Sequence, residues 1–326
     1  SNLYYIEQQA DLAELIVEKV VGHPGKIFFS NSGAEANDGL IKFARRFGQA
    51  TGRYDVITFN KSFHGRTIGA MTATAQAKIH EGFAPLPTGF TYVEPNDLDA
   101  VQAALTDKTI AFLLEPIQGE GGYVVPPPGF IPRLKEVLDR FGILLVADEV
   151  QTGAGRTGRF FALEHEGVQA DVYVLAKGLA SGYPISAVLF REELGSWPPG
   201  AHGTTFGGQA VAAAAAHATL DLLEGGLQEN AARLGEFLLA ELRALKRRFP
   251  FLGDVRGRGL MIGLDFGDPD HPRPDLRDKA VRLAFEKGLL LLPAGTSALR
   301  IAPPLVLTQE EAALGLEILE EVFRAL

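Results

Sequence analysis

Two residues that could take part in covalent chemistry stand at the ends of two apolar stretches. Lys177 ends the stretch Val172–Lys177, and Asp148 stands near the end of Ile143–Glu149. If both stretches are buried strands of one sheet, the two side chains reach the same edge of that sheet. A lysine beside a glycine-rich turn can form a Schiff base, and a nearby aspartate is the partner that the ring nitrogen of a pyridoxal cofactor requires. Taken alone, such a lysine is more often a solvated residue at a strand end.

The segment Lys26–Asn37 has the pattern of a strand, a turn of small residues and the start of a helix. Its turn contains Ser32, Gly33 and Ala34. Because the first N–H groups of a helix have no intrahelical acceptor and lie at the positive end of the helix dipole, such a turn can bind a phosphate. The alternative is an ordinary helix start in which Ser32 and Glu35 form a capping box.

The turn Ser62–Thr67 combines an aromatic residue, a histidine and an arginine. Phe63 could stack on a flat cofactor ring, and Arg66 could bind a carboxylate through two parallel hydrogen bonds. His64 could carry a proton, although a hydrogen-bonded structural histidine is the more common arrangement. For Arg66 the alternative is a surface position in a loop.

Two glutamates frame a glycine-rich loop, and an arginine stands in an apolar stretch far from them in sequence. Glu115 ends a predicted strand, and Glu120 follows in the loop, where it could move. Arg300 lies between apolar residues, and a buried arginine needs an anionic partner. We therefore expect Glu120 and Arg300 to pair when no substrate is bound. The alternative is a permanent salt bridge between two domains.

One motif favours a different cofactor. Residues Gly153–Gly158 read GAGRTG, which matches the dinucleotide-binding pattern G-x-G-x-x-G after a predicted strand. That pattern should open a helix directly and be followed by an acidic residue ~20 positions later. Here the polar segment Asp148–Thr152 intervenes and no clear second strand follows, which disfavours an NAD-dependent oxidoreductase.

Short apolar segments that could position these residues alternate with helix-length segments. Seven of them are rich in β-branched and aromatic residues: Lys26–Phe29, Val56–Phe59, Phe90–Val93, Ile110–Glu115, Ile143–Asp148, Val172–Ala176 and Ile185–Phe190. This alternation predicts an α/β fold with a mostly parallel seven-stranded sheet that helices cover on both faces. Such sheets bind ligands at the carboxyl ends of their strands, which is where Glu115, Asp148 and Lys177 stand.

The pattern changes from residue 209 onward. We expect residues 1–208 to form a large cofactor-binding domain and residues 209–326 to form connecting helices and a smaller α+β domain. The expected elements of the second part are helices at about 209–224 and 229–248, strands near 260–265 and 289–292, a loop at Asp268–Asp275 and a closing helix at about 309–326.

The composition restricts the possible classes of function. The chain has 326 residues and a net charge of −9, which argues against a nucleic-acid partner because phosphate backbones attract basic faces. It has no cysteine, so disulfides, thiolate nucleophiles and cysteine zinc sites are excluded, and we expect no metal site. Neither a signal peptide nor an apolar run of membrane-spanning length is visible. We expect no membrane partner and a cytoplasmic location.

Seven motifs occur in one order along the chain: NSGAEAN, SFHGRT, EPIQGEGG, DEVQTGAGRTG, LAKGLASG, HGTTFGG and RGRGLMIG. Together they resemble class III aminotransferases, which are fold-type I enzymes that use pyridoxal 5′-phosphate. The resemblance covers essentially the whole chain. It implies that Lys177 holds the cofactor as a Schiff base and moves a proton between substrate and cofactor. It also implies that Asp148 keeps the ring nitrogen protonated, so that the ring acts as an electron sink.

The same resemblance implies the other contacts of the cofactor. Val150 and Phe63 would lie on the two faces of the ring, Gln151 would lie near its O3′ oxygen, and Glu115 would belong to the same site. Thr205 would reach the cofactor phosphate of a neighbouring subunit, which implies a homodimer. The phosphate would otherwise lie against the turn formed by Ser32, Gly33 and Ala34.

The resemblance further implies how substrates bind. Arg66 would bind the carboxylate of an ω-amino substrate, and Arg300 the α-carboxylate of glutamate or 2-oxoglutarate, with Glu120 covering Arg300 in the other half-reaction. We expect N-acetylornithine as the amino donor, and a place in arginine biosynthesis, because the stretch from Gly82 to Leu113 lacks an insertion common in 4-aminobutyrate aminotransferases. The alternatives are 4-aminobutyrate, ornithine, or a racemase on the same scaffold. The family usually begins with a further N-terminal segment, which we expect to be absent here.

Overall fold

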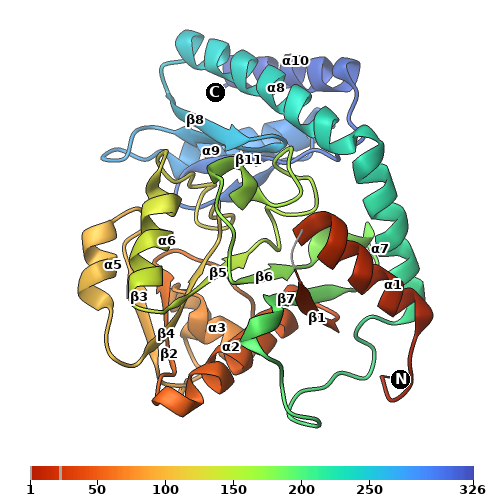
Figure 1. Cartoon of the computed structure of the whole chain (residues 1–326). Helices are drawn as coiled ribbons and strands as arrows, with labels where there is room; N and C mark the ends of the chain where they lie inside the picture. Colours follow the sequence, from red (N-terminus) through yellow and green to blue (C-terminus); the bar gives the residue numbers. More distant parts are fainter. Residues whose placement is uncertain (1, 22–23) are drawn as a thin grey trace. The chain divides into compact units, whose positions relative to one another are not determined.

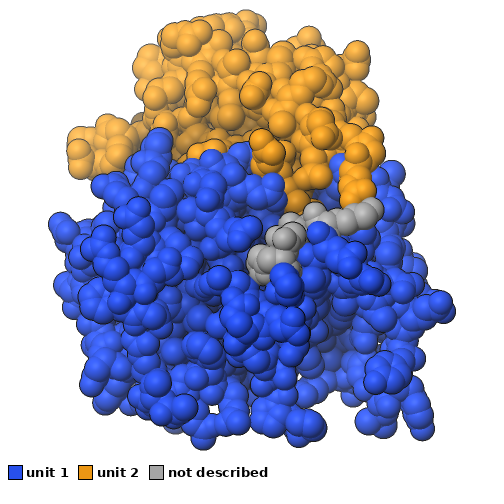
Figure 2. All heavy atoms as spheres, viewed as in Figure 1, with its two compact units in different colours: residues 1–116, 126–154, 161–223 blue, residues 117–125, 155–160, 224–326 orange. Residues whose placement is uncertain are grey.

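The computed structural model describes residues 2–21 and 24–326 (Figure 1). The chain forms two compact units, which Figure 2 shows in different colours. The first unit contains Ser1–Pro116, Pro126–Ala154 and Phe161–Leu223. The second unit contains Ile117–Val125, Gly155–Phe160 and Glu224–Leu326. Each unit has its own sheet and its own hydrophobic core.

A seven-stranded sheet forms the centre of the first unit. Its strands are β1 Gly25–Ser30, β2 Asp55–Phe59, β3 Phe90–Val93, β4 Thr109–Leu114, β5 Leu144–Asp148, β6 Val172–Leu175 and β7 Ser186–Arg191 (Figure 1). Their order across the sheet is β1-β7-β6-β5-β4-β2-β3. Strand β7 runs antiparallel to β1 and β6, and the other neighbours are parallel. The predicted α/β fold with a mostly parallel seven-stranded sheet is confirmed.

Helices cover both faces of this sheet. They include α1 Glu7–Leu15, continued by a π-helix at Ile16–Val21, and α2 Gly33–Gly48, α3 Ile68–Ala73, α4 Ala77–His80, α5 Leu98–Ala104, α6 Phe130–Arg140 and α7 Ala210–Leu222. Leu40 of α2 packs with Val146 and Val174 in one buried cluster. Phe130 of α6 contacts Phe59 on the other face, with ring centroids 6.0 Å apart. Strands covered on both faces can be apolar along their whole length, which is why these strands are visible in the sequence as continuous apolar runs.

The second unit is built on a four-stranded antiparallel sheet. Its strands are β8 Leu252–Arg258, β9 Met261–Phe266, β10 Leu292–Ala294 and β11 Ala298–Ile301, in the order β10-β11-β9-β8. The helices of this unit include α8 Gln228–Arg248, α9 Pro274–Glu286 and α10 Gln309–Arg324. This is an α+β arrangement, as the change of pattern after residue 208 indicates.

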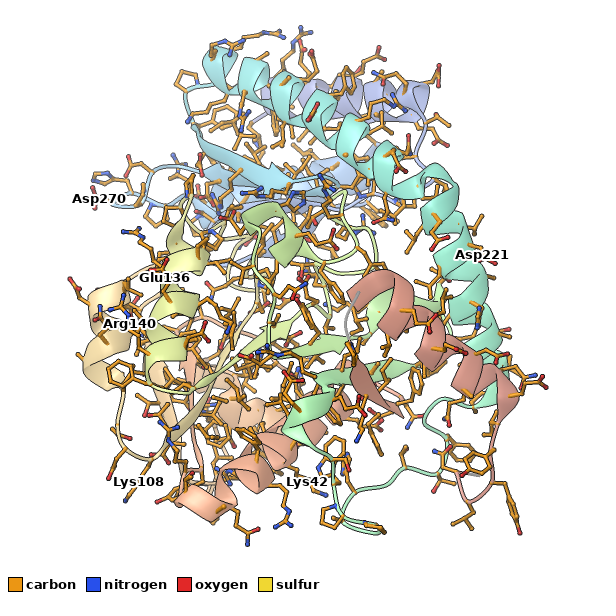
Figure 3. All side chains as sticks on the ribbon, viewed as in Figure 1. Lys42, Lys108, Glu136, Arg140, Asp221 and Asp270 are labelled. Carbon is orange, nitrogen blue, oxygen red and sulfur yellow. The ribbon has the colours of Figure 1, made fainter. Side chains whose placement is uncertain are left out.

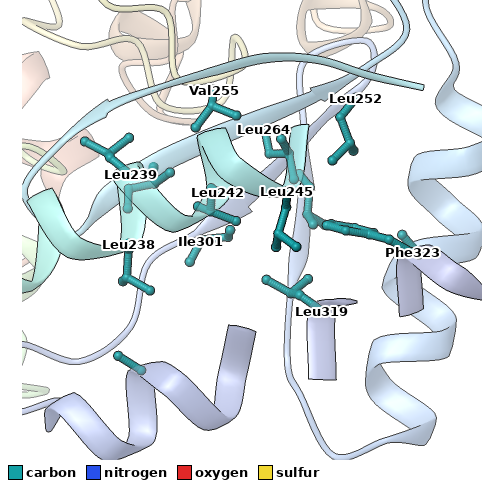
Figure 4. Packing of buried hydrophobic residues seen from close by; sticks show 14 of the residues in the cluster. Leu238, Leu239, Leu242, Leu245, Leu252, Val255, Leu264, Ile301, Leu319 and Phe323 are labelled. Atoms are coloured by element: carbon teal, nitrogen blue, oxygen red, sulfur yellow. The ribbon is translucent and has the colours of Figure 1, made fainter. Parts of the chain in front are cut away.

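Leucines on one face of α8 form the core of the second unit. Leu238, Leu242 and Leu245 follow one another at helical spacing, so they share a face and pack with Leu319 and Phe323 of α10 (Figure 4). Each buried leucine of this kind stabilises the fold by roughly 1.5–3 kcal/mol relative to an exposed one. The unit therefore has the apolar core that it needs to hold the short strands of its sheet in place.

Some predicted elements of the second unit differ from the observed ones. The strand expected near 289–292 is wrong, because β10 begins only at Leu292. Strands β8 and β11 were not predicted: β8 contains Asp, two Arg and two Gly, and β11 has only four residues. The loop expected at Asp268–Asp275 ends earlier, because α9 starts at Pro274, a residue that suits the first helical turn.

None of the described helices is both long and apolar enough to cross a membrane. Among the described residues, no group of three or more His, Asp or Glu side chains is arranged to hold a metal ion.

Candidate active site

The carboxyl ends of β5 and β6 bring Asp148 and Lys177 to one edge of the sheet. The two strands are parallel neighbours, and Asp148 lies opposite Val174 in their register. Lys177 follows β6 directly after Ala176 and begins a short 3-10 turn with a φ of 44°. A left-handed backbone at a non-glycine residue is strained and is typical of functional sites. The side chain of Lys177 is exposed.

Asp148 is a buried carboxylate whose orientation is fixed from three directions. Its Oδ2 atom accepts a hydrogen bond from Asn37 Nδ2 at 2.9 Å and contacts His64 Nδ1 at 2.7 Å, and its Oδ1 atom accepts the backbone N–H of Val150 at 3.1 Å. Only 3% of its surface is exposed. Asn37 lies on α2, His64 in the turn after β2, and Val150 in the loop after β5.

Asn37 was not predicted to belong to the site, and for His64 a structural hydrogen bond was the more common alternative to a role as proton carrier. Asn37 Nδ2 also donates to the carbonyl of His64 at 2.7 Å, so it joins the helix, the turn and the strand. One signal could have revealed it: Asn37 falls among Ala36, Leu40 and Ile41 on the buried stripe of α2, and a polar residue in such a stripe needs a buried partner.

The turn before α2 lies against the residues that flank Asp148 and Lys177. A Cβ atom placed on Gly33 would come within 3.0 Å of Val150 Cγ1 and 3.7 Å of Ala176 Cβ. Ser32 caps the helix, because its Oγ accepts the N–H of Glu35 at 3.3 Å. The expected capping box is only half present, since the Glu35 carboxylate accepts the N–H of Asn31 rather than that of Ser32.

The turn Ser62–Thr67 packs beside the same helix start. Gly65 has a φ of 134°, and a Cβ atom there would come within 2.6 Å of Ala34 Cβ, so only glycine fits this position. The backbone N–H of Phe63 donates to Glu115 Oε1 at 2.9 Å, which ties the turn to the end of β4. The exposed Arg66 guanidinium lies 5.0 Å from the centre of the Phe63 ring.

The residues at this edge fit a phosphorylated pyridine aldehyde. The helix start offers backbone donors for a phosphate, Asp148 offers a fixed carboxylate, and Lys177 offers an amine. Gln151 Oε1 is buried and has no hydrogen-bond donor among the described residues, and buried acceptors of this kind usually have a partner. A ligand with a polar group beside the Asp148 loop would supply one.

Glu149 is a buried carboxyl next to Asp148 that was not predicted from the sequence. The hydroxyl of Thr152 donates to its Oε2 atom, and the N–H of Leu163 donates to its Oε1 atom at 3.1 Å. Burial raises the pKa of Glu149 to about 7, against the opposing effect of these hydrogen bonds. Its position next to Asp148 lets it anchor the loop that carries Val150 and Gln151.

Thr205 lies in the loop before α7. Asn31, next to Ser32, donates from Nδ2 to Thr204 Oγ1 at 3.2 Å, so this loop reaches the turn before α2. Thr205 is exposed and lines a cavity of about 650 Å³, whose other lining residues are Asn2, Leu3, Gln9, Ile27, Phe28, Phe29, Gly200, His202, Gly203 and Thr204.

Glu120 and Arg300 form an ion pair inside the second unit. Arg300 Nη1 donates to Glu120 Oε1 at 2.6 Å, and both residues belong to that unit, so the pair does not join two units. Arg300 lies on β11, with its side chain 17% exposed, whereas Glu120 is 38% exposed. The buried Tyr123 lies beside them: burial raises the pKa of its hydroxyl, and the Arg300 guanidinium opposes this.

The motif Gly153–Gly158 forms turns and opens no helix. The next regular element is a 3-10 helix at Ala162–Glu166, so the dinucleotide-binding pattern lacks the strand–turn–helix context it needs. The charged side chains labelled in Figure 3 lie outside the clusters described above and are exposed: Lys42, Lys108, Glu136, Arg140, Asp221 and Asp270.

Comparisons with known proteins identify the family. The model of the family "Aminotransferase class-III" matches residues 1–323. The acetylornithine aminotransferase of Caldanaerobacter subterraneus is 43% identical over 99% of this chain and 81% of its own length. That of Gloeobacter violaceus is 45% identical over 100% and 81%.

Solved structures agree. An ornithine aminotransferase of Toxoplasma gondii, whose structure shows partial occupancy of pyridoxal phosphate at the active site, superposes with a TM-score of 0.91 at 33% identity. The match covers 99% of this chain and 77% of that one. Pyridoxal phosphate is the cofactor of this family, and the helix start, the fixed carboxylate and the lysine at the sheet edge fit it. The chain belongs to the class III aminotransferases.

Proposed function

We propose that this chain transfers the terminal amino group of N-acetylornithine to 2-oxoglutarate, giving a semialdehyde and glutamate. The main support is the set of acetylornithine aminotransferases that are 41–45% identical over 95–100% of this chain. A role in arginine biosynthesis and a cytoplasmic location follow from the same proposal.

Bound pyridoxal phosphate would supply an electron sink for the carbon that bears the amino group. Lys177 would hold the cofactor through its Nζ atom. It would then carry a proton from the donor carbon to the cofactor in the first half-reaction, and from the cofactor to the carbon of the oxo acid in the second. The Asp148 carboxylate, which Asn37 and His64 orient, would hold a proton on the ring nitrogen. Because this carboxylate is already hydrogen-bonded and buried, it needs no reorganisation when the reaction begins.

The remaining cofactor contacts would come from neighbouring turns. The N–H groups around Ser32, Gly33 and Ala34 would bind the phosphate. Phe63 and Val150 would lie on the two ring faces. Gln151 would lie near the ring hydroxyl oxygen. Glu115 would hold Phe63 in place by accepting the backbone N–H of Phe63.

Two arginines would distinguish the substrates by their carboxylates. Arg66 would bind the carboxylate of N-acetylornithine far from the reacting amine. Arg300 would bind the α-carboxylate of 2-oxoglutarate, and Glu120 would leave Arg300 at that stage and cover it again when the donor binds. A bidentate arginine–carboxylate contact provides both the affinity and the orientation that this alternation requires.

The proposal includes a homodimer in which Thr205 of each chain reaches the cofactor phosphate bound by the other. It also treats residues 1–208 as the cofactor-binding domain and residues 209–326 as the smaller domain. The homodimer is supported by the exposure of Thr205, which lines a cavity of about 650 Å³.

A donor panel with 2-oxoglutarate as acceptor tests the substrate. N-acetylornithine should give the highest kcat/KM, ahead of ornithine and 4-aminobutyrate, when glutamate release is measured. A preference for either competitor would reassign the donor, and turnover of a chiral amino acid without any oxo acid would indicate a racemase.

Chemical labelling tests the residue assignment. Borohydride reduction of the holoenzyme followed by peptide mapping should place the pyridoxyl group on Lys177. Lys61, another lysine with a positive φ (63°), is the matched control and should stay unlabelled. A label on any lysine other than Lys177 would overturn the assignment.

A further inference from the structure

The loop that carries Glu120 is held as a closed unit. Gln118 and Val124 exchange two backbone hydrogen bonds of 3.1 Å across its base. Tyr123 is buried and has a φ of 54°, which side chains rarely adopt. We call residues 117–125 the Glu120 loop. A strained residue persists only where the surrounding structure fixes it, so neighbouring contacts must hold this loop in its shape.

Arg256 of β8 holds the loop from outside. Its Nε atom donates to the carbonyl of Tyr123 at 2.9 Å, and its Nη2 atom donates to the carbonyl of Gly122 at 2.5 Å. Its Nη1 atom donates to Asp254 at 3.0 Å and to Asp265 at 2.5 Å. The two aspartates hold the planar guanidinium through Nη1, while Nε and Nη2 donate to the carbonyls of two consecutive residues of the loop. A lysine ammonium cannot reproduce this geometry.

The sheet register places Arg256 in the same row across the sheet as Arg300. Arg256 lies opposite Gly263 in the β8–β9 pair, and Gly263 lies opposite Arg300 in the β9–β11 pair. A Cβ atom on Gly263 would come within 2.9 Å of Tyr123 Cβ, so the loop packs directly over the middle of this row. The N–H of Gly295 donates to the carbonyl of Glu120 at 2.9 Å and fixes the other side.

We propose that Arg256 is a positioning residue that fixes the Glu120 loop, so that Glu120 can close on Arg300. It touches neither substrate nor cofactor in this scheme, which rests on the proposed function. With the loop fixed, the Glu120 side chain needs only to rotate in order to cover or release Arg300. With the loop loosened, ordering it adds an entropic cost to every closure, and Arg300 stays uncovered more often. Arg256 thereby controls how well the enzyme separates ω-amino donors from α-amino acids.

The first test follows the loop itself. In Arg256→Lys, hydrogen exchange of the amides at 118–124 should speed up by about tenfold or more, because a net difference of one hydrogen bond corresponds to roughly that factor. Arg248→Lys is the matched control, since Arg248 makes a similar two-pronged contact with Glu320 in the same unit, at 2.8 and 2.5 Å. Unchanged loop exchange in a folded Arg256→Lys variant would overturn the proposal.

The second test separates positioning from general damage. In Arg256→Lys, kcat/KM for N-acetylornithine relative to glutamate should fall about twofold to threefold, with the change mainly in KM, because the Glu120–Arg300 pair through which Arg256 acts is partly exposed. In a Glu120→Ala background the same substitution should have no further effect on this ratio, because coupled residues are non-additive. Additive effects would mean that Arg256 does not act through Glu120.

If the Arg256→Lys protein does not fold, Asp265→Asn serves as the second variant, because it weakens one contact of Arg256 and leaves the guanidinium intact. This variant should speed up hydrogen exchange of the loop amides and lower the ratio of kcat/KM for N-acetylornithine to that for glutamate, each by a smaller factor than Arg256→Lys. No shift with that folded variant would contradict the proposal. A wild-type enzyme that turns over none of the ω-amino donors would refute the proposed function instead, and the exchange test would still decide the role of Arg256.

Discussion

Two carboxylates with proposed roles in the reaction, Asp148 in the first unit and Glu120 in the second, have opposite surroundings. Asp148 is 3% exposed and bound by groups from a helix, a turn and a loop. Glu120 is 38% exposed and its carboxylate meets one arginine. Removing a partner from a buried charge costs about 3–5 kcal/mol, whereas a partly exposed ion pair contributes about 0–1 kcal/mol. The first arrangement suits a charge that must stay fixed, and the second suits a charge that must move.

The largest effect is expected from Asp148→Asn. The introduced amide keeps the size of the side chain but removes the negative charge, so both half-reactions should slow by about 10³-fold, as when a preorganised electrostatic partner is removed. Single-turnover rates with each substrate measure this. A loss confined to one half-reaction would mean that Asp148, like Glu120, acts on only one substrate.

A smaller effect is expected from Glu149→Gln, and it concerns the free energy of unfolding. This variant tests how burial alone changes the pKa of a carboxyl group. Burial raises the pKa of Glu149 to about 7 from an ordinary value of 4.5, so the folded protein holds this proton more tightly than the unfolded chain. The resulting stabilisation is fully present below pH 4.5 and is lost as the pH rises to about 7. It amounts to something on the order of 3 kcal/mol.

Denaturant unfolding at several pH values checks this. The free energy of unfolding of the wild type should fall across that window relative to the Glu149→Gln variant, whose amide cannot ionise. Glu136→Gln is the control, because Glu136 is an exposed glutamate of the same unit. Parallel pH profiles for wild type and Glu149→Gln would show that Glu149 stays charged when buried.

The smallest effect is expected from Glu120→Gln. Loss of the charge leaves Arg300 uncovered, so kcat/KM for the ω-amino donor should fall by about threefold to fivefold, in line with a partly exposed pair. The half-reaction with 2-oxoglutarate should change by less than about twofold, since Glu120 has left Arg300 at that stage. Equal losses in both half-reactions would contradict the contrast between a fixed and a movable carboxylate.

The large sheet could be predicted from the sequence, and much of the small sheet could not. Strands buried on both faces, such as β5, appear as continuous apolar runs. Strand β8 instead carries Arg256 and its partner Asp254, which bind a distant loop, so tertiary contacts override its local pattern.

The site shows the same division. Lys177 and Asp148 could be predicted to share an edge because strand direction is local information. The contacts of Asp148 with Asn37 and His64 join segments far apart in sequence, and no local pattern fixes which residues meet across such distances. Arg256 was missed for the same reason.

The discontinuity of the second unit has a consequence for folding. The Glu120 loop is encoded between β4 and α6 of the first unit, yet Tyr123 fills a small buried cluster with Ile117 and Met261 in the second. A fragment that starts at Glu224 would leave Met261 without this cover and Arg256 without its two carbonyls. The second unit can therefore complete its core only after the chain through β4 has been made and its own C-terminal strands have formed.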